Sequence, residues 1–104
     1  MWYVIQVGGG KEKSAHRLIE RFVPEGLMKE LFIPQYEIMK RYEGEWRTCT
    51  ETLLPGYLFV VTNQPEKLAV ALRDVPAFTR LLGNNDMFTP LTDQEVAFVN
   101  AFTE

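Results

Sequence analysis

The chain has 104 residues and a net charge of -3, and 46% of its residues are hydrophobic. This length suits one compact domain with a single core, and the apolar fraction is too high for a disordered chain. The acidic balance argues against a protein that coats nucleic acid through bulk positive charge, but the first 52 residues hold eight of the eleven Lys and Arg residues and leave room for a local basic face.

Cysteine and histidine are scarce. Cys49 is the only cysteine and His16 the only histidine, so the chain cannot form an internal disulfide and most metal sites built on histidine are excluded. No apolar run approaches the roughly 18 residues of a transmembrane helix, and the N-terminus lacks the segments of a signal peptide. We therefore expect a cytoplasmic protein without a metal, another cofactor or a membrane partner.

The N-terminal region predicts a strand followed by a helix. Residues 2–7, WYVIQV, are largely apolar at both alternating sets of positions, which is typical of a strand at the centre of a sheet. After the turn Gly8-Gly9-Gly10, apolar residues recur at helical spacing until Pro24. The opposite face of this helix is basic and carries Lys13, Arg17 and Arg21.

The next region predicts a polar hairpin. Residues 31–40 and 46–52 read as extended segments joined by a turn at 42–45. Pro34 cannot donate to a sheet ladder, so we expect it at an edge or a bulge.

The second half continues with two strands and two helices. The turn Pro55-Gly56 precedes the strongest strand signal, residues 57–61, and a helix begins near Pro65. A short strand follows at 78–82, and Thr92 with Glu95 forms a capping box for a last helix through Phe102. This order predicts an α+β fold, a ferredoxin-like antiparallel sheet with helices on one face and an inserted β-hairpin.

The turn of three glycines and Lys11 does not match a nucleotide site. A phosphate loop requires Ser or Thr after Gly-Lys, and here Glu12 follows. His16 and Cys49 lie on separate elements, and no carboxylate pair marks an acid–base site. We therefore expect a binding module, with no catalytic residue and no small-molecule substrate, rather than an enzyme.

Two segments resemble a known family. One is WYVIQV with its Gly-Lys-Glu turn and amphipathic helix, and the other is LLPGYLFV, followed by a helix and VPAFTRLLG. In this order they resemble the N-terminal domain of NusG-type transcription elongation and antitermination factors, over essentially the whole chain. The resemblance implies a ferredoxin-like fold with an inserted hairpin. The loose glycine turn departs from the expected housekeeping pattern and suggests a specialised paralogue.

The resemblance implies a polymerase-binding surface. Family members bind the clamp helices of the largest subunit of RNA polymerase and favour processive, pause-resistant elongation. By motif match, the binding residues here are Gln6, Leu54, Tyr57 and Phe59, with Leu54 standing where the family more often has Phe. Alternation places Tyr57 and Phe59 on one sheet face. We expect that face to be exposed for binding; the alternative is that both side chains belong to the core.

Two basic regions are candidates for contact with upstream DNA. One is the helix face with Lys11, Lys13, Arg17 and Arg21, and the other is the hairpin tip with Arg41, Trp46 and Arg47. The cationic side chains would contact phosphates, and Trp46 would stack on an unpaired base. The alternative is a solvated helix face and a tryptophan packed locally against the hairpin.

We expect residues 1–104 to form a single NusG N-terminal-like domain. Most family members continue through a linker into a small β-barrel of the KOW type, and this chain contains no such segment, so functions of that barrel are not assigned to these residues. A second hypothesis is a ferredoxin-like regulatory or small-molecule-binding domain that dimerises through its uncovered sheet face.

Overall fold

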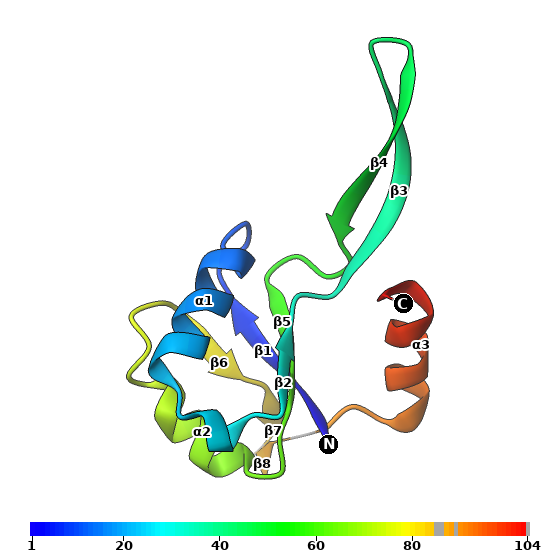
Figure 1. Cartoon of the computed structure of the whole chain (residues 1–104). Helices are drawn as coiled ribbons and strands as arrows, with labels where there is room; N and C mark the ends of the chain where they lie inside the picture. Colours follow the sequence, from blue (N-terminus) through cyan, green and yellow to red (C-terminus); the bar gives the residue numbers. More distant parts are fainter. Residues whose placement is uncertain (85–86, 89, 104) are drawn as a thin grey trace.

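A computed structural model describes residues 1–84, 87–88 and 90–103 of the chain (Figure 1). The described part contains three α-helices, one 3-10 turn and eight strands. In chain order they are β1 (Trp2–Val7), α1 (Glu12–Phe22), the 3-10 turn η1 (Glu25–Leu27), β2 (Glu30–Phe32), β3 (Gln35–Tyr42), β4 (Glu45–Thr52), β5 (Tyr57–Val61), α2 (Pro65–Leu72), β6 (Thr79–Leu81), β7 (Gly83–Asn84), β8 (Met87–Phe88) and α3 (Asp93–Thr103).

The main sheet has four strands in the order β2-β5-β1-β6, and every neighbouring pair is antiparallel. The two central strands, β1 and β5, are the two apolar runs that flank the predicted hairpin in sequence. Trp2 pairs with Val61 at one end of their ladder, and Gln6 pairs with Tyr57 at the other. The predicted α+β class with an antiparallel sheet and an inserted hairpin is confirmed.

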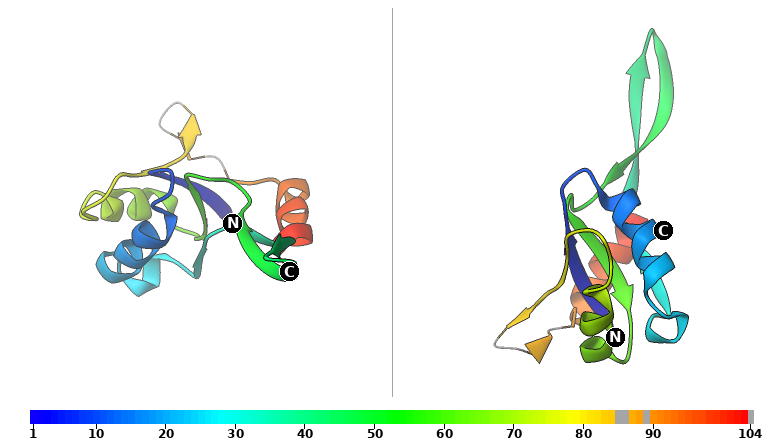
Figure 2. Two further views of the ribbon diagram at one scale, coloured as in Figure 1. Left: turned by 90° about the horizontal axis from the view of Figure 1, so that it is seen from above. Right: turned by 90° about the vertical axis from the view of Figure 1, so that its left-hand side faces the viewer.

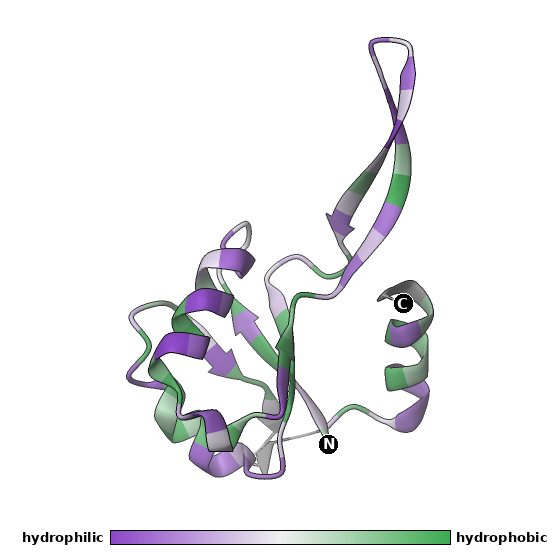
Figure 3. Cartoon of the chain, viewed as in Figure 1, coloured by the Kyte–Doolittle hydropathy of each residue, from purple (hydrophilic) through white to green (hydrophobic). Residues whose placement is uncertain are grey.

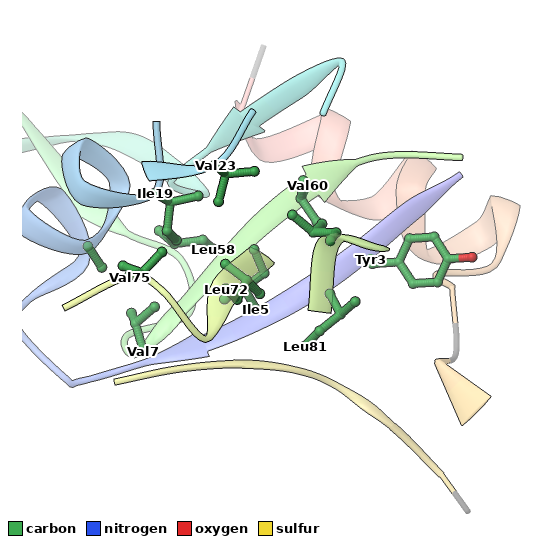
Figure 4. Close-up of a cluster of buried hydrophobic side chains, with 12 residues drawn as sticks. Tyr3, Ile5, Val7, Ile19, Val23, Leu58, Val60, Leu72, Val75 and Leu81 are labelled. Carbon is green, nitrogen blue, oxygen red and sulfur yellow. The ribbon is translucent and has the colours of Figure 1, made fainter. Parts of the chain in front are cut away.

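The core lies between this sheet and the pair α1 and α2 (Figure 4). Side chains alternate along a strand, so one set from each central strand faces these helices. The buried cluster comprises Tyr3, Ile5 and Val7 of β1, Leu58 and Val60 of β5, Ala15, Ile19 and Val23 of and after α1, Leu68 and Leu72 of α2, and Val75 and Leu81. The spacing of the three α1-derived residues, four apart, is the helical stripe that the sequence predicts.

The last helix lies on the opposite face of the sheet from α1 and α2 (Figure 2). Its approach is fixed by a hydrogen bond from the Leu91 N–H to the Trp2 carbonyl, 2.7 Å, which carries the chain across the start of β1. The capping box is confirmed: Glu95 N–H donates to Thr92 Oγ1 at 3.2 Å, and Thr92 N–H donates to Glu95 Oε1 at 3.0 Å. The expectation that the helices share one face therefore holds for α1 and α2 and not for α3.

The inserted hairpin, β3 and β4, projects away from the main sheet and gives the molecule a long dimension of 50 Å (Figure 1). It begins after Pro34, which interrupts the extended segment between β2 and β3, in agreement with the predicted break. At its end, Glu43 and Gly44 both have positive φ, 50° and 84°, as a two-residue type I′ turn requires. A second, very short hairpin, β7 and β8, follows β6 and was not predicted from the sequence.

In the part of the chain that the structure describes, no helix is both long enough and apolar enough to cross a membrane.

The core position of Leu58 predicts a large loss of stability on truncation. Leu58 is 0% exposed at the centre of β5, so Leu58→Ala removes buried methyl groups and leaves a cavity. We expect the free energy of unfolding to fall by about 2–5 kcal/mol, measured by urea denaturation. The control Val70→Ala, at a position on α2 that is 57% exposed, should change it by less than about 0.5 kcal/mol. Similar losses for both variants would contradict this assignment of the core.

Candidate functional site

An apolar groove of about 750 Å³ lies between the second face of the sheet, the β4–β5 loop and α3. The apolar side chains that line it come from all three parts: Val4, Leu53, Leu54, Tyr57, Phe59, Leu82, Leu91, Phe98 and Val99. Thr92, Gln94 and Glu95 form its polar end at the start of α3. We call this feature the apolar groove.

Three of the four predicted polymerase-binding residues line the apolar groove. Leu54 is 43% exposed at its rim, Tyr57 is half-buried, and Phe59 lies beneath them. Gln6 is half-buried and directly opposite Tyr57 in the β1–β5 ladder, so it borders this region without lining it. The structure thus brings Gln6 close to three residues that are 48 or more positions away from it in sequence.

The expectation that Phe59 is exposed is wrong. Phe59 is 2% exposed, and its ring packs edge-on against Phe32 with centroids 5.6 Å apart and beside Trp2 at 6.4 Å. Trp2 and Phe32 also meet edge-on, at 5.3 Å. Alternation assigned Phe59 to the correct face, but the rings of Phe32 on the edge strand β2 and of Trp2 on β1 pack against it. Phe59 is therefore core on this face of the sheet, the alternative that the sequence left open.

Residues of α3 are the part of the groove that sequence reasoning missed. Phe98 is 60% exposed and Val99 is 5% exposed, so the helix presents one apolar side chain to solvent and buries its neighbour. The capping box revealed the helix, but no signal in its sequence showed that it would cross to the second face of the sheet.

The rim of the groove is held by a tight turn. Tyr57 N–H donates to the Leu54 carbonyl at 3.3 Å, with Pro55 and Gly56 between them and Gly56 at a φ of 86°. Proline at the second position and a positive φ at the third define a type II turn, which explains the Pro-Gly pair. Gly56 in turn accepts from the Val7 N–H at 2.8 Å, which joins the turn to the end of β1.

Glu12 joins this turn to the glycine turn before α1. Its Oε1 accepts hydrogen bonds from the Gly56 N–H at 2.9 Å and from the Gly10 N–H at 3.2 Å. The hydrogen bond from Gly56 is the largest cause that holds the pKa of the Glu12 carboxyl below its usual value. The carboxylate of Glu12 therefore occupies an N–H group of the glycine turn that would otherwise be available to an anion.

The basic face of α1 is exposed as predicted. Lys13, Arg17 and Arg21 follow one another at intervals of four along α1, and Lys11 precedes the helix. Within residues 1–84, 87–88 and 90–103, none of these four side chains forms an ion pair. Lys13 and Arg17 also line a hollow of about 560 Å³ whose apolar side is formed by Phe32 and Ile33.

The hairpin tip divides its predicted residues between two faces. Arg41 pairs directly with Trp46, and Lys40 pairs with Arg47, so alternation puts Arg41 and Trp46 on one face and Arg47 on the other. Trp46 is 65% exposed, so the alternative that it packs locally is wrong. Arg47 lies 3.7 Å from Glu45 in an exposed ion pair.

The structure does not join the two basic regions into one surface. The hairpin tip stands well apart from α1 (Figure 1), and hydrophilic residues mark both places separately (Figure 3). Within the described ranges, no three metal-ligating side chains come together.

The family model described as "Transcription termination factor nusG" matches residues 1–100.

The chain belongs to the NusG family.

Relatives named as NusG proteins share about a quarter of the sequence. "Transcription termination/antitermination protein NusG" of Campylobacter jejuni is 26% identical over 102 residues, which cover 94% of this chain and 58% of that protein. The protein of the same name from Lactococcus lactis is 29% identical over 102 residues, covering 91% and 55%. This chain spans a little more than half the length of these relatives.

A solved structure gives the same fold. The structure described as "Domain interaction in Thermotoga maritima NusG" matches with a TM-score of 0.72 at 22% identity, and the match covers 98% of this chain and 56% of the other. The NusG-family fold therefore agrees with the α+β fold expected from sequence.

The type II turn predicts a strict requirement for glycine at position 56. A Cβ there would be strained by the φ of 86°, so we expect Gly56→Ala to lower the free energy of unfolding by about 1–2 kcal/mol. Gly26→Ala is the matched control, because that glycine has open space around its Cβ position and is not in the left-handed region. Chemical denaturation of both variants measures the difference, and a Gly56→Ala protein as stable as the control would contradict the turn assignment.

Proposed function

We propose that this NusG-family domain binds the clamp helices of the largest subunit of RNA polymerase through the apolar groove and so favours processive, pause-resistant elongation. The single observation that carries this proposal is the groove itself, an apolar hollow with exposed side chains at its rim. Leu54 is 43% exposed and Phe98 is 60% exposed on its two sides. Contiguous exposed apolar surface of this kind marks a site of protein contact.

The groove has the physical properties that a helical hairpin tip requires. Removal of apolar surface from water contributes about 25 cal/mol per Å² before the costs of association. Phe59 lines the groove and packs against Trp2 and Phe32, so this part of the surface is held in place before binding and loses little freedom on docking. Tyr57 is the residue most suited to be a hot spot, because it combines a large ring with a polar tip at the groove wall.

Family membership supports the same assignment. Relatives that are 26% and 29% identical to this chain are named as transcription termination/antitermination proteins. The activity of those longer proteins is carried over to this chain as part of the proposal, with the groove as the part of the molecule that would perform the docking.

Contact with upstream DNA is the second part of the proposal. Lys11, Lys13, Arg17 and Arg21 are exposed and have no ion-pair partner among the described residues, so their charges are available to phosphates. Trp46, with Arg41 directly across the ladder, offers an exposed ring and a cation on one hairpin face. A ring in this setting would stack on an unpaired base.

The alternative, a dimer formed through the open sheet face, is less favoured. Helix α3 lies against that face and already buries Val99 there (Figure 2). A sheet-to-sheet dimer would require α3 to leave its position.

The docking proposal predicts a specific loss of affinity. Tyr57→Ala should weaken binding to isolated clamp helices by at least about tenfold, because it removes a large side chain from the groove wall. Calorimetry or a pull-down measures the effect, with Val70→Ala on the far helix layer as the control. Equal affinities for the wild type and Tyr57→Ala would contradict the proposal, as would a tight dimer in sedimentation that hides Tyr57.

The DNA proposal predicts a change in salt dependence. The variant that combines Lys13→Ala, Arg17→Ala and Arg21→Ala should show a less steep fall of log affinity with log salt concentration. For duplex DNA, each lost phosphate contact should reduce the magnitude of this slope by about 0.9. Fluorescence anisotropy over a salt series measures the slope. The variant that combines Lys67→Ala and Arg73→Ala, at exposed positions of and after α2, is the control. An unchanged slope in the first variant would remove α1 from the DNA surface.

A further inference from the structure

A buried carboxylate lies where the start of α1 meets the Leu54–Tyr57 turn at the rim of the apolar groove. Glu12 is the first residue of α1 and is 7% exposed. Among the residues that the structure describes, the buried polar or charged set contains Glu12 and Thr62 alone. A buried charge is unfavourable unless hydrogen bonds replace its water, so its position reflects a specific set of donors.

Those donors are two backbone N–H groups from glycines far apart in sequence. Gly10 donates at 3.2 Å from the turn before α1, and Gly56 donates at 2.9 Å from the turn before β5, 44 residues after Glu12. Both glycines have positive φ, 78° and 86°, which L side chains rarely adopt. A Cβ on Gly56 would lie 3.9 Å from the Gly9 Cα, so the two turns approach each other closely.

The Gly56 residue is held from both ends by this arrangement. Its N–H is bound by Glu12, and its carbonyl is bound by the Val7 N–H at 2.8 Å. It is also the third residue of the turn from Leu54 to Tyr57, whose first and last side chains line the groove. The direction of the Gly56 N–H therefore sets the orientation of the turn, and with it the rim of the groove.

We propose that Glu12 is a positioning residue, which fixes the Leu54–Tyr57 turn in its docking geometry through the hydrogen bonds from Gly10 and Gly56. The inference rests on the proposed function, because it assigns the turn to the surface that receives the clamp helices. It also joins that surface to the N-terminal end of the basic face, since Lys11 and Lys13 flank Glu12 in the chain.

The charge of Glu12 strengthens this junction. The Gly56 N–H and the N–H of Glu12 itself lower the pKa of the carboxyl from the ordinary value of 4.5, so the group is ionised at neutral pH. Hydrogen bonds to an ionised acceptor are about twice as strong as those between neutral groups. The charged side chains of Lys13 and Glu51 line the same hollow as Glu12.

The competing explanation is that Glu12 only complements the dipole of α1. A glutamate in the first turn of a helix is stabilising wherever it occurs. Glu66, in the first turn of α2, provides the matched control because it is exposed and its carboxylate accepts no hydrogen bond from another element among the residues that the structure describes. The dipole explanation predicts similar effects for Glu12→Ala and Glu66→Ala, whereas positioning predicts an effect on docking for Glu12→Ala alone.

The first experiment measures binding of the 104-residue chain to isolated clamp helices. Glu12→Ala should bind about tenfold more weakly than wild type, and Glu12→Gln, whose carbonyl oxygen still accepts both hydrogen bonds, should lie between them. Glu66→Ala should bind as wild type. Duplex DNA affinity should be nearly unchanged in Glu12→Gln, because the basic side chains remain. Wild-type affinity in Glu12→Ala, or an equal loss in Glu66→Ala, overturns the inference.

The second experiment reads the junction directly by NMR. The amide proton shifts of Gly10 and Gly56 should titrate with one common midpoint below 4.5, and this titration should vanish in Glu12→Gln. Because the folded pKa is lowered, the contribution of the carboxylate is present above the unfolded value and is lost as pH falls through the folded one. Different midpoints, or a titration that persists in Glu12→Gln, overturn the inference even if Glu12→Ala fails to fold.

The two experiments separate this inference from the proposed function. If neither the wild type nor Tyr57→Ala binds the clamp helices, the proposed function fails and the docking part of the inference fails with it. If wild type binds, Tyr57→Ala does not, and Glu12→Ala binds normally, the proposed function stands and the inference alone is overturned.

Discussion

The alternation of side chains along β1 and β5 is the constraint on which the rest of the structure depends. Each strand is apolar at both sets of positions, so each must find cover on two faces. The helices α1 and α2 fully cover one face, where Ile5 and Leu58 are 0% exposed. The other face is bordered by the β4–β5 loop and helix α3, and an apolar groove lies between them. The groove therefore exists because both faces of β1 and β5 are apolar and the second face is only partly covered.

The turns at the ends of these strands convert that constraint into a defined site. The turn after β1 and the turn before β5 meet at one end of these two central strands. There, hydrogen bonds join Gly56 to Val7 and to Glu12. The glycine-rich sequence that first suggests a phosphate site serves instead to bring two turns into contact. Glu12, the residue that breaks the nucleotide motif, supplies the acceptor for their N–H groups.

Much of the fold could be predicted from local patterns, because its elements carry their own signals. The stripe on α1, the Pro-Gly turn, the capping box at Thr92 and the break at Pro34 all depend on neighbours within a few residues. The burial of Phe59 could not be predicted, because it depends on ring contacts with Trp2 and Phe32, which are distant in sequence. The position of α3 could not be predicted either, because it depends on which face of the sheet the helix reaches. Glu12 was overlooked as a buried group for the same reason: its principal donor, Gly56, is 44 residues away. Local sequence assigns a side chain to a face, and tertiary contact decides whether that face is covered.

The placement of the two tryptophans has a practical consequence for spectroscopy. Trp2 is half-buried and packs against Phe32 and against Phe59, which lines the groove, whereas Trp46 is 65% exposed at the far end of the hairpin. Indole emission shifts to the blue in apolar surroundings, so we expect the half-buried Trp2 to emit at shorter wavelength than the exposed Trp46. A protein partner in the groove would perturb the blue component and a nucleic acid at the hairpin would quench the red one. Single-tryptophan variants at positions 2 and 46 would therefore report on each surface separately, without an attached dye.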